Sequence, residues 1–303
     1  MPLTYAEVRK LTLDPATHPR GRPFLSAASG LVRMGRRHYV VADDEQHLGV
    51  FDAASPGPVQ LIRLFDGDLP ESAKKRKAKK ADLETLVLLP PLPRCPGGAL
   101  LALGSGSRPN RMRGALLGLD AAGAPLGPVR VLDLEPLYEP LGKRFDELNI
   151  EGAVISGDDL MLLQRGSKGG PNATLRFAWS DVEAWLLGEA SSGPKLRAVR
   201  EYDLGEVDGV AFGFTDATAL PDGGWLFSAV AEATDNSYDD GSCSGAAIGV
   251  IGPDGALRAV QDLAPRRKVE GVDARQVQGK LVIGMVTDAD DPEQPAEYGT
   301  ATL

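Results

Sequence analysis

Four acidic residues with similar neighbours are the residues in this sequence best suited to chemistry. The short phrases that hold them are Leu83-Glu84-Thr85, Ile150-Glu151-Gly152, Thr215-Asp216-Ala217 and Val269-Glu270-Gly271. Carboxylates gathered in a small space repel one another, so they must be protonated, paired with arginine or bound to a hard cation. Ligand sets made only of oxygen favour Ca²⁺ or Mg²⁺ over zinc. We therefore predict that Glu84, Glu151, Asp216 and Glu270 bind Ca²⁺. The alternative is that they pair with arginine or accept backbone N–H bonds.

A second set of polar residues is expected beside these carboxylates, at the ends of neighbouring strands. Arginine next to a carboxylate can bind an anion through two hydrogen bonds while a metal or an acid polarises it. The predicted catalytic residues are Arg165, Asn172 and Asp288, and the predicted substrate-binding residues are Arg108, Arg111, Arg113 and Lys168. The expected partner is a small anionic molecule. For Arg165, cancelling the charge of the carboxylates remains the alternative role.

The spacing of the acidic phrase indicates which elements position these residues. Its copies recur at roughly 55 to 70 residues, the length of one small sheet, as in radially repeated folds. A degenerate copy stands at Ala28-Ser29-Gly30. The chain has 36 Gly and 23 Pro among 303 residues, which suits many short strands joined by tight turns. We predict an all-β fold.

Each repeat can be divided into four strands. In the third repeat these are residues 149–155, 160–164, 173–179 and 196–204. The last repeat lacks an outer strand, whereas residues 7–13 have the outer-strand pattern and precede the first repeat. Pairing the two would leave no open edge. The prediction is a five-bladed β-propeller of four-stranded blades, a single domain over residues 1–303, closed by the N-terminal strand in the last blade.

The long loops identify the functional face. They fall between the fourth strand of one blade and the first of the next, or between second and third strands, and these connections share one face. They comprise residues 66–81, 104–113, 135–148, 165–171, 232–245 and 288–295. Long loops on one side of a rigid scaffold usually carry the function. The basic run at 74–80 lies in one of them, either as a solvated loop or as a guide for anions.

Net charge excludes some classes of partner. The formal charge is −9 at pH 7, whereas nucleic acids and anionic membranes require a basic surface. We expect neither as a partner. Residues 1–10 contain no apolar signal segment, so a cytoplasmic location is expected.

Three longer phrases resemble a known group of proteins. Asn149-Ile150-Glu151-Gly152, Gln164-Arg165-Gly166 followed by Asn172, and Val269-Glu270-Gly271 with Thr287-Asp288 resemble bacterial propeller families described as phytase-like with esterase-like activity, and the related SdiA-regulated propellers. The resemblance implies an axial carboxylate ring that holds calcium, and hydrolysis of an ester or phosphoester.

Two functions follow from these expectations. One is a calcium-dependent hydrolase of a small anionic ester, phosphoester or lactone. The other is a non-catalytic propeller that binds a ligand or a protein. The hydrolase requires a cavity with unpaired carboxylates or a bound metal at its mouth. The binding propeller instead predicts a flat rim, with carboxylates neutralised by arginine and loop amides.

Overall fold

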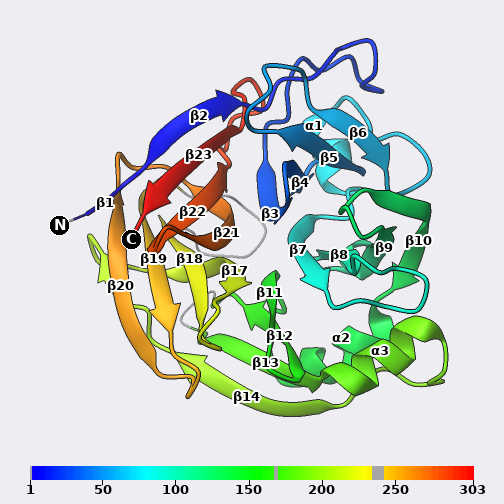
Figure 1. Ribbon diagram of the computed structural model, residues 1–303, viewed down its shortest axis with the longest axis vertical. Helices are drawn as coiled ribbons and strands as arrows, with labels where there is room; N and C mark the ends of the chain where they lie inside the picture. Colours follow the sequence, from blue (N-terminus) through cyan, green and yellow to red (C-terminus); the bar gives the residue numbers. More distant parts are fainter. Residues whose placement is uncertain (1, 167–169, 234–241) are drawn as a thin grey trace.

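Five sheets arranged in a ring form a β-propeller (Figure 1). The computed structural model describes residues 2–166, 170–233 and 242–303. Blade 1 contains β3 (Ala28–Met34), β4 (Arg37–Ala42), β5 (His47–Asp52) and β6 (Gln60–Arg63). Blade 2 contains β7 (Leu83–Leu89), β8 (Ala99–Gly104), β9 (Arg113–Leu119) and β10 (Pro125–Asp133). Blade 3 contains β11 (Ile150–Ser156), β12 (Asp159–Gln164), β13 (Asn172–Ala178) and β14 (Leu196–Tyr202).

The last two blades involve the N-terminus. Blade 4 contains β17 (Gly213–Ala219), β18 (Trp225–Ala233), β19 (Ser242–Ile251) and β20 (Leu257–Ala264). Blade 5 contains β21 (Val269–Val277), β22 (Lys280–Thr287), β23 (Glu297–Thr302) and the N-terminal β2 (Ala6–Lys10), which is antiparallel to β23. The predicted five blades and their closure are thus confirmed. The closing strand is shorter than predicted, because residues 12 and 13 instead form isolated bridges to Phe24 and Val59.

An unexpected strand extends blade 4. Leu3 and Thr4 form β1 (Leu3–Thr4), which pairs in parallel with β20, so the N-terminal segment crosses from blade 4 to blade 5. In Figure 1, β1 lies beside β20, and β2 lies beside the C-terminal β23. The remaining elements are α1 (Ala73–Lys77), η1 (Pro109–Arg111), α2 (Glu135–Gly142), α3 (Trp179–Leu187), β15 (Glu206–Val207) and β16 (Val210–Ala211).

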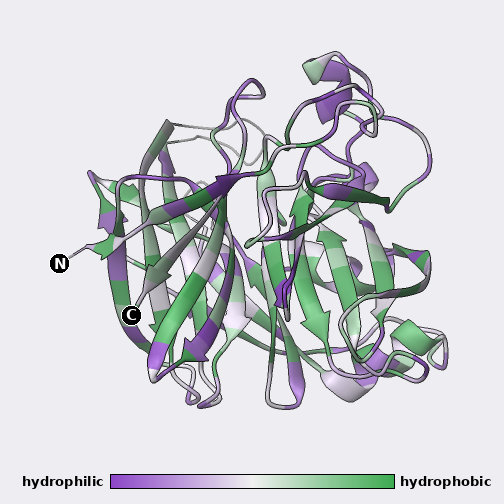
Figure 2. Ribbon diagram, turned by 45° about the horizontal axis from the view of Figure 1, so that its top comes forward, coloured by the Kyte–Doolittle hydropathy of each residue, from purple (hydrophilic) through white to green (hydrophobic). Residues whose placement is uncertain are grey.

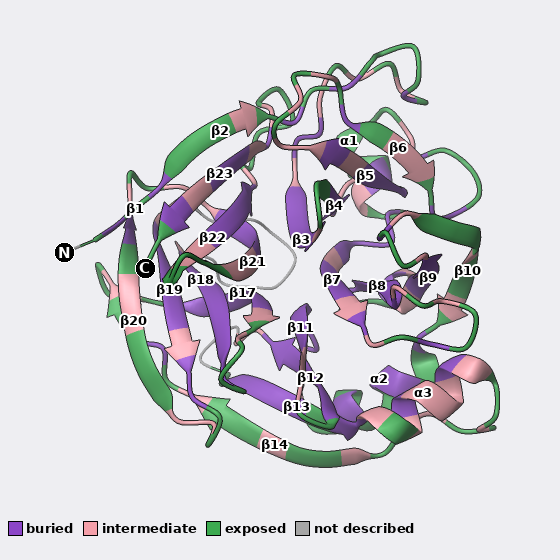
Figure 3. Cartoon of the chain, in the orientation of Figure 1, coloured by how far each residue is buried: buried purple, intermediate pink, exposed green. Residues whose placement is uncertain are grey.

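The core lies between adjacent blades. Every residue of β8 and of β12 is buried, whereas most of β10 and β14 on the outside is exposed (Figure 3). Apolar residues follow the strands, while α1 and the loops near it are largely hydrophilic (Figure 2). In the described part of the chain, no helix has the length and apolar character needed to cross a membrane. The packed strands thus form a rigid base for the loops.

Candidate functional site

A β-bulge begins the first strand of every blade. In each, the pairing register skips one residue, which is Ser29, Glu84, Glu151, Thr215 or Glu270. A bulge leaves its extra residue unpaired and redirects the side chain. Three of these five positions hold glutamate. The repeated phrase in the sequence is therefore a repeated bulge around the propeller axis.

The bulges correct the prediction for Asp216. Thr215, and not Asp216, is the counterpart of Glu151, and its hydroxyl contacts Ser228 Oγ at 2.7 Å and Val269 O at 2.8 Å. Asp216 is fully buried one position later. Its carboxylate accepts the N–H of Ala217 at 2.8 Å and that of Val272 in the next blade at 2.9 Å. Asp216 therefore joins two blades through backbone amides, which is the alternative that the sequence left open.

The first group of charges, here the Lys80 cluster, comprises Asp43, Lys80, Asp82, Glu84 and Arg111. Asp43, Asp82 and Glu84 each offer a carboxylate oxygen within 4.8 Å of the others, close enough to hold a metal ion. Lys80 Nζ contacts Asp43 Oδ2 and lies 2.8 Å from Asp82 Oδ1, and Arg111 lies 2.6 Å from Asp82 Oδ2. Of the four predicted calcium ligands, only Glu84 belongs to such a group among the described residues.

The second group, here the Lys268 cluster, comprises Glu151, Arg165, Glu232, Lys268, Glu270, Asp288 and Asp290. Arg165 lies 2.8 Å from Glu232 and 3.6 Å from Glu151. Lys268 Nζ lies 2.5 Å from Glu232 and 3.4 Å from Glu270. The same ammonium is 2.5 Å from Asp290 and 3.8 Å from Asp288. Glu151 and Glu270 are thus paired with cations, as in the alternative to metal binding.

The two clusters carry an excess of negative charge. Eight carboxylates, namely Asp43, Asp82, Glu84, Glu151, Glu232, Glu270, Asp288 and Asp290, face four cations, namely Lys80, Arg111, Arg165 and Lys268. If all were ionised, these twelve residues would together carry a net charge of −4. Such an excess favours protonation of some carboxyl groups or the binding of an added cation.

The pKa values respond to this excess. Burial raises the pKa values of Glu84 and Glu270 well above the ordinary range, with nearby carboxylates adding to the effect. Burial raises the pKa of Glu151 to about 7 although Arg165 opposes the shift, and it raises that of Asp288 to about 8 although Lys268 opposes it. Burial also opposes ionisation of Asp82, but Lys80 and Arg111 prevail and lower its pKa. Several of these carboxyl groups therefore retain a proton near neutral pH.

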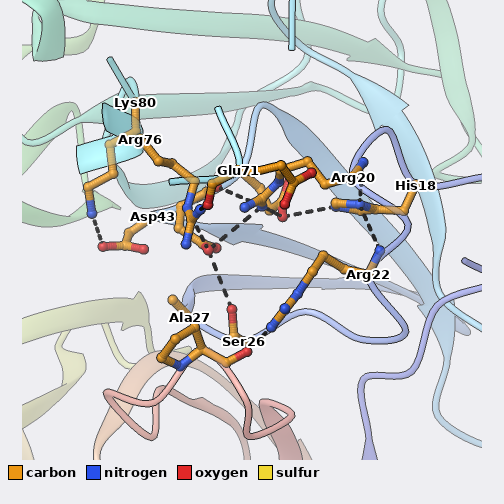
Figure 4. Close-up of polar contacts among 12 residues, drawn as sticks. His18, Arg20, Arg22, Ser26, Ala27, Asp43, Glu71, Arg76 and Lys80 are labelled. Atoms are coloured by element: carbon orange, nitrogen blue, oxygen red, sulfur yellow. Dashed lines mark hydrogen bonds and ion pairs between the residues drawn. The ribbon is translucent and has the colours of Figure 1, made fainter. Parts of the chain in front are cut away.

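A pocket of about 150 Å³ adjoins the Lys80 cluster on the same face. One side comes from the segment containing α1, with Arg76, Lys77 and Lys80. The other side comes from blades 1 and 5. The acidic residues that line it are Asp43, Asp44, Asp288, Asp290 and Asp291. Figure 4 shows Lys80 and Arg76 pointing from the α1 segment toward Asp43 and its neighbours. Asp43 and Lys80 belong to both the pocket and the cluster.

Other predicted site residues lie outside the two clusters or form hydrogen bonds with the backbone. Asn172 accepts the N–H groups of Gly166 and Phe214, both at 3.1 Å, and donates to Phe212 O at 2.8 Å. Arg113 stacks over the Phe65 ring, and Arg108 is exposed. Lys168 lies outside the described residues. The side chains of Arg165, Arg111 and Asp288 do reach the clusters. Their catalytic and binding roles, like that of Asn172, stay predictions.

The sequence prediction gave Asp82 and Lys268 no role, and it included Lys80 only within the basic run at 74–80. A signal for two of them was present. Asp82 and Lys268 stand two positions before the bulged Glu84 and Glu270, and Lys268 contacts Glu270. In blade 3, Asn149 occupies the same position and donates to Glu151. Side chains two apart on a strand share a face.

Comparison with known proteins identifies a family. The profile of a family of unknown function, DUF6929, matches residues 24–303. The chain belongs to this family. The sequence resemblance therefore holds at the level of a propeller family, and the matching family is not the phytase-like one. No curated protein matches this DUF6929 member.

Solved structures with similar folds are distant in sequence. A glutaminyl cyclase from Myxococcus xanthus superposes with a TM-score of 0.50 at 13% identity over 100% of both chains. An α-L-arabinofuranosidase from Podospora anserina, in complex with cellotriose, gives 0.50 at 10% identity over 100% of this chain and 96% of the other. A gluconolactonase from Xanthomonas campestris gives 0.43 at 14% identity over 91% and 72%. At such identities the two superpositions of 0.50 show the propeller fold alone.

Proposed function

We propose that the protein binds a divalent cation through Asp43, Asp82 and Glu84, and hydrolyses a small anionic ester, phosphoester or lactone in the adjoining pocket. The observation that supports this most strongly is the spacing of the three carboxylates, within 4.8 Å of one another. They also stand on rigid supports, since Asp82 and Glu84 flank the start of β7 and Asp43 directly follows β4. Oxygen ligands of this kind suit Ca²⁺, which is the ion we propose.

In the proposed reaction, the cation and a residue of the pocket each perform one task. A bound cation would polarise the carbonyl or phosphoryl oxygen of the substrate. Asp288 lines the same pocket, and its pKa of about 8 leaves its carboxyl group protonated at neutral pH. A protonated carboxyl group can donate its proton to a leaving oxygen. Asp288 is therefore the general acid in this proposal.

Thermal unfolding with and without added metal tests the cation site. We expect Ca²⁺ to raise the melting temperature of the wild type, since a ligand at 100 times its Kd stabilises by about 2.7 kcal/mol. Glu84→Gln and Asp82→Asn should abolish the rise in melting temperature with Ca²⁺, because each substitution removes a charged ligand and keeps the shape of the side chain. Glu139→Gln changes an exposed carboxylate that pairs with Lys143 outside both clusters, so it serves as the control. Glu151→Gln should retain the response, because Glu151 pairs with Arg165.

If the wild type binds none of Ca²⁺, Mg²⁺ and Mn²⁺ in metal analysis and in thermal-shift measurements, the proposed cation site is excluded. The hydrolase is tested separately, with a panel of esters, phosphoesters and lactones assayed with metal and with chelator. Turnover that survives the chelator would contradict the role of the cation.

The second candidate is a propeller that binds its ligand without turnover. The observation that favours it is the pairing of Glu151, Glu232 and Glu270 with Arg165 and Lys268, as expected for carboxylates used in structure. Metal binding without hydrolysis of any compound in the panel would support this candidate over the hydrolase.

A further inference from the structure

Lys80 already occupies part of the proposed cation site. Its ammonium lies between Asp43 and Asp82, two of the three carboxylates that could hold a metal ion, and its side chain is only 9% exposed. A lysine side chain carries a positive charge at neutral pH. A divalent ion that binds the same carboxylate oxygens must compete with this ammonium, because two cations at contact distance repel each other.

The backbone of Lys80 is held by hydrogen bonds, whereas its side chain can reorient toward the pocket. Its N–H donates to Arg76 O at 2.8 Å, and its carbonyl accepts from Asn110 Nδ2 at 2.8 Å. The side chain is a flexible four-carbon chain that can reorient without moving these bonds. Because Lys80 also lines the pocket, reorientation would move its ammonium into that space (Figure 4).

We infer that Lys80 is a built-in competitor of the metal ion and becomes the substrate-binding cation once the metal displaces it. This inference rests on the proposed function and extends it. The metal must bind first, because until then Asp43 and Asp82 hold the ammonium. The displaced ammonium then binds the anionic group of the substrate in the pocket. Arg165 and Arg111 need not perform this role, since both are held by carboxylates.

Calcium affinity measured by titration calorimetry tests the competition. Lys80→Met should bind Ca²⁺ at least tenfold more tightly than the wild type, because the competing ammonium is gone. Lys79→Met is the matched control, since Lys79 is adjacent and exposed, and it should change the affinity by less than twofold. Equal affinities for Lys80→Met and wild type would overturn the inference and leave the cation site standing. Absence of binding in every variant would overturn both.

Labelling of the unmodified protein keeps the test valid if Lys80→Met does not fold. Acetic anhydride acetylates accessible amines, and mass spectrometry reads out each lysine. Lys80 should be protected without metal and become labelled with saturating Ca²⁺, while the labelling of Lys79 stays constant. A rate for Lys80 that does not change with Ca²⁺ would overturn the displacement.

Sulfate serves as the probe for the last step. The wild type should bind sulfate more tightly, by at least tenfold, when Ca²⁺ is present, and Lys80→Met should lose this gain. Equal sulfate affinity with and without Ca²⁺ would contradict the role of Lys80 as the anion-binding group.

Discussion

Arg165 illustrates how a single residue can serve either charge balance or substrate binding. Its guanidinium bridges Glu232 and Glu151, and its side chain is 13% exposed. Burial disfavours its charge, yet Glu232 and Glu151 raise its pKa above the ordinary value. The geometry matches the charge-cancelling alternative.

Arg165→Met should therefore destabilise the protein. Removing one partner of a buried ion pair leaves a carboxylate without compensation, at a cost of about 3–5 kcal/mol in the free energy of unfolding. Arg176→Met is the control in the same blade, because Arg176 pairs with Asp159 while its side chain is 49% exposed, and such pairs contribute less than about 1 kcal/mol. Chemical denaturation measures both. Unchanged stability of Arg165→Met would instead support substrate binding.

The residue types at the site could be predicted better than their pairing. Glu84, Glu151 and Glu270 were identified because a repeated acidic residue within one phrase is visible in the sequence. Asp216 was misplaced because a bulge shifts the equivalence by one position, which composition does not reveal. The pairing of Lys268 with Glu232 joins different blades, so it depends on tertiary structure.

At the scale of elements, the first strands of adjacent blades meet at the axis with almost no space between them. A Cβ added at Gly152 would lie 2.8 Å from the Cα of Asp216, and one at Gly271 would lie 2.9 Å from the Cα of Gly30. These contacts are with backbone atoms that cannot move aside. Glycine at positions 152 and 271 is thus required by the close approach of neighbouring strands.

Gly152→Ala should lower the free energy of unfolding by about 2–3 kcal/mol, as overpacking of a rigid core does. Gly142→Ala is the control, because nothing lies within 4 Å of a Cβ at this position, at the end of α2. It should change stability by less than about 1 kcal/mol. Equal effects of the two substitutions in urea denaturation would contradict the tight axial packing.

Strands were the most predictable elements. Turn residues and apolar runs locate their boundaries to within a few residues, as for β14, expected at 196–204 and found at Leu196–Tyr202. The strand β1 was missed because two residues contain no periodic pattern, and its pairing with β20 depends on the path of the chain between blades.

At the scale of the whole molecule, the N-terminal segment joins the ends of the ring. Leu3, Tyr5, Leu11 and Leu13 are buried. Arg9, on β2, donates to the carbonyl groups of Asp52, Ser55 and Gly57 in blade 1. The segment therefore completes blade 5 and also fastens it to its neighbour.

Deletion of residues 1–14 should unfold or aggregate the protein, because it exposes the edge of β23 and removes these buried side chains. Val8→Thr, at a residue of the same strand that is 47% exposed, should leave stability within about 0.5 kcal/mol of the wild type. Light scattering and thermal unfolding measure the outcome. A truncated protein that stays monomeric with an unchanged melting temperature would contradict this role.

The closure also affects the order of events during synthesis. Tyr5 and Glu297 are in contact although 292 positions separate them, and β2 pairs with the last strand of the sheet. During synthesis β2 is made long before β23, so the ring cannot close until residues 297–302 have been made. Contacts so distant in sequence slow folding, because a long loop must be closed before they form. In a circular permutant, the neighbouring ends would be joined and the chain opened at an exposed turn. The strands of blade 5 would then be contiguous in sequence and could pair sooner, while every blade would keep its strands.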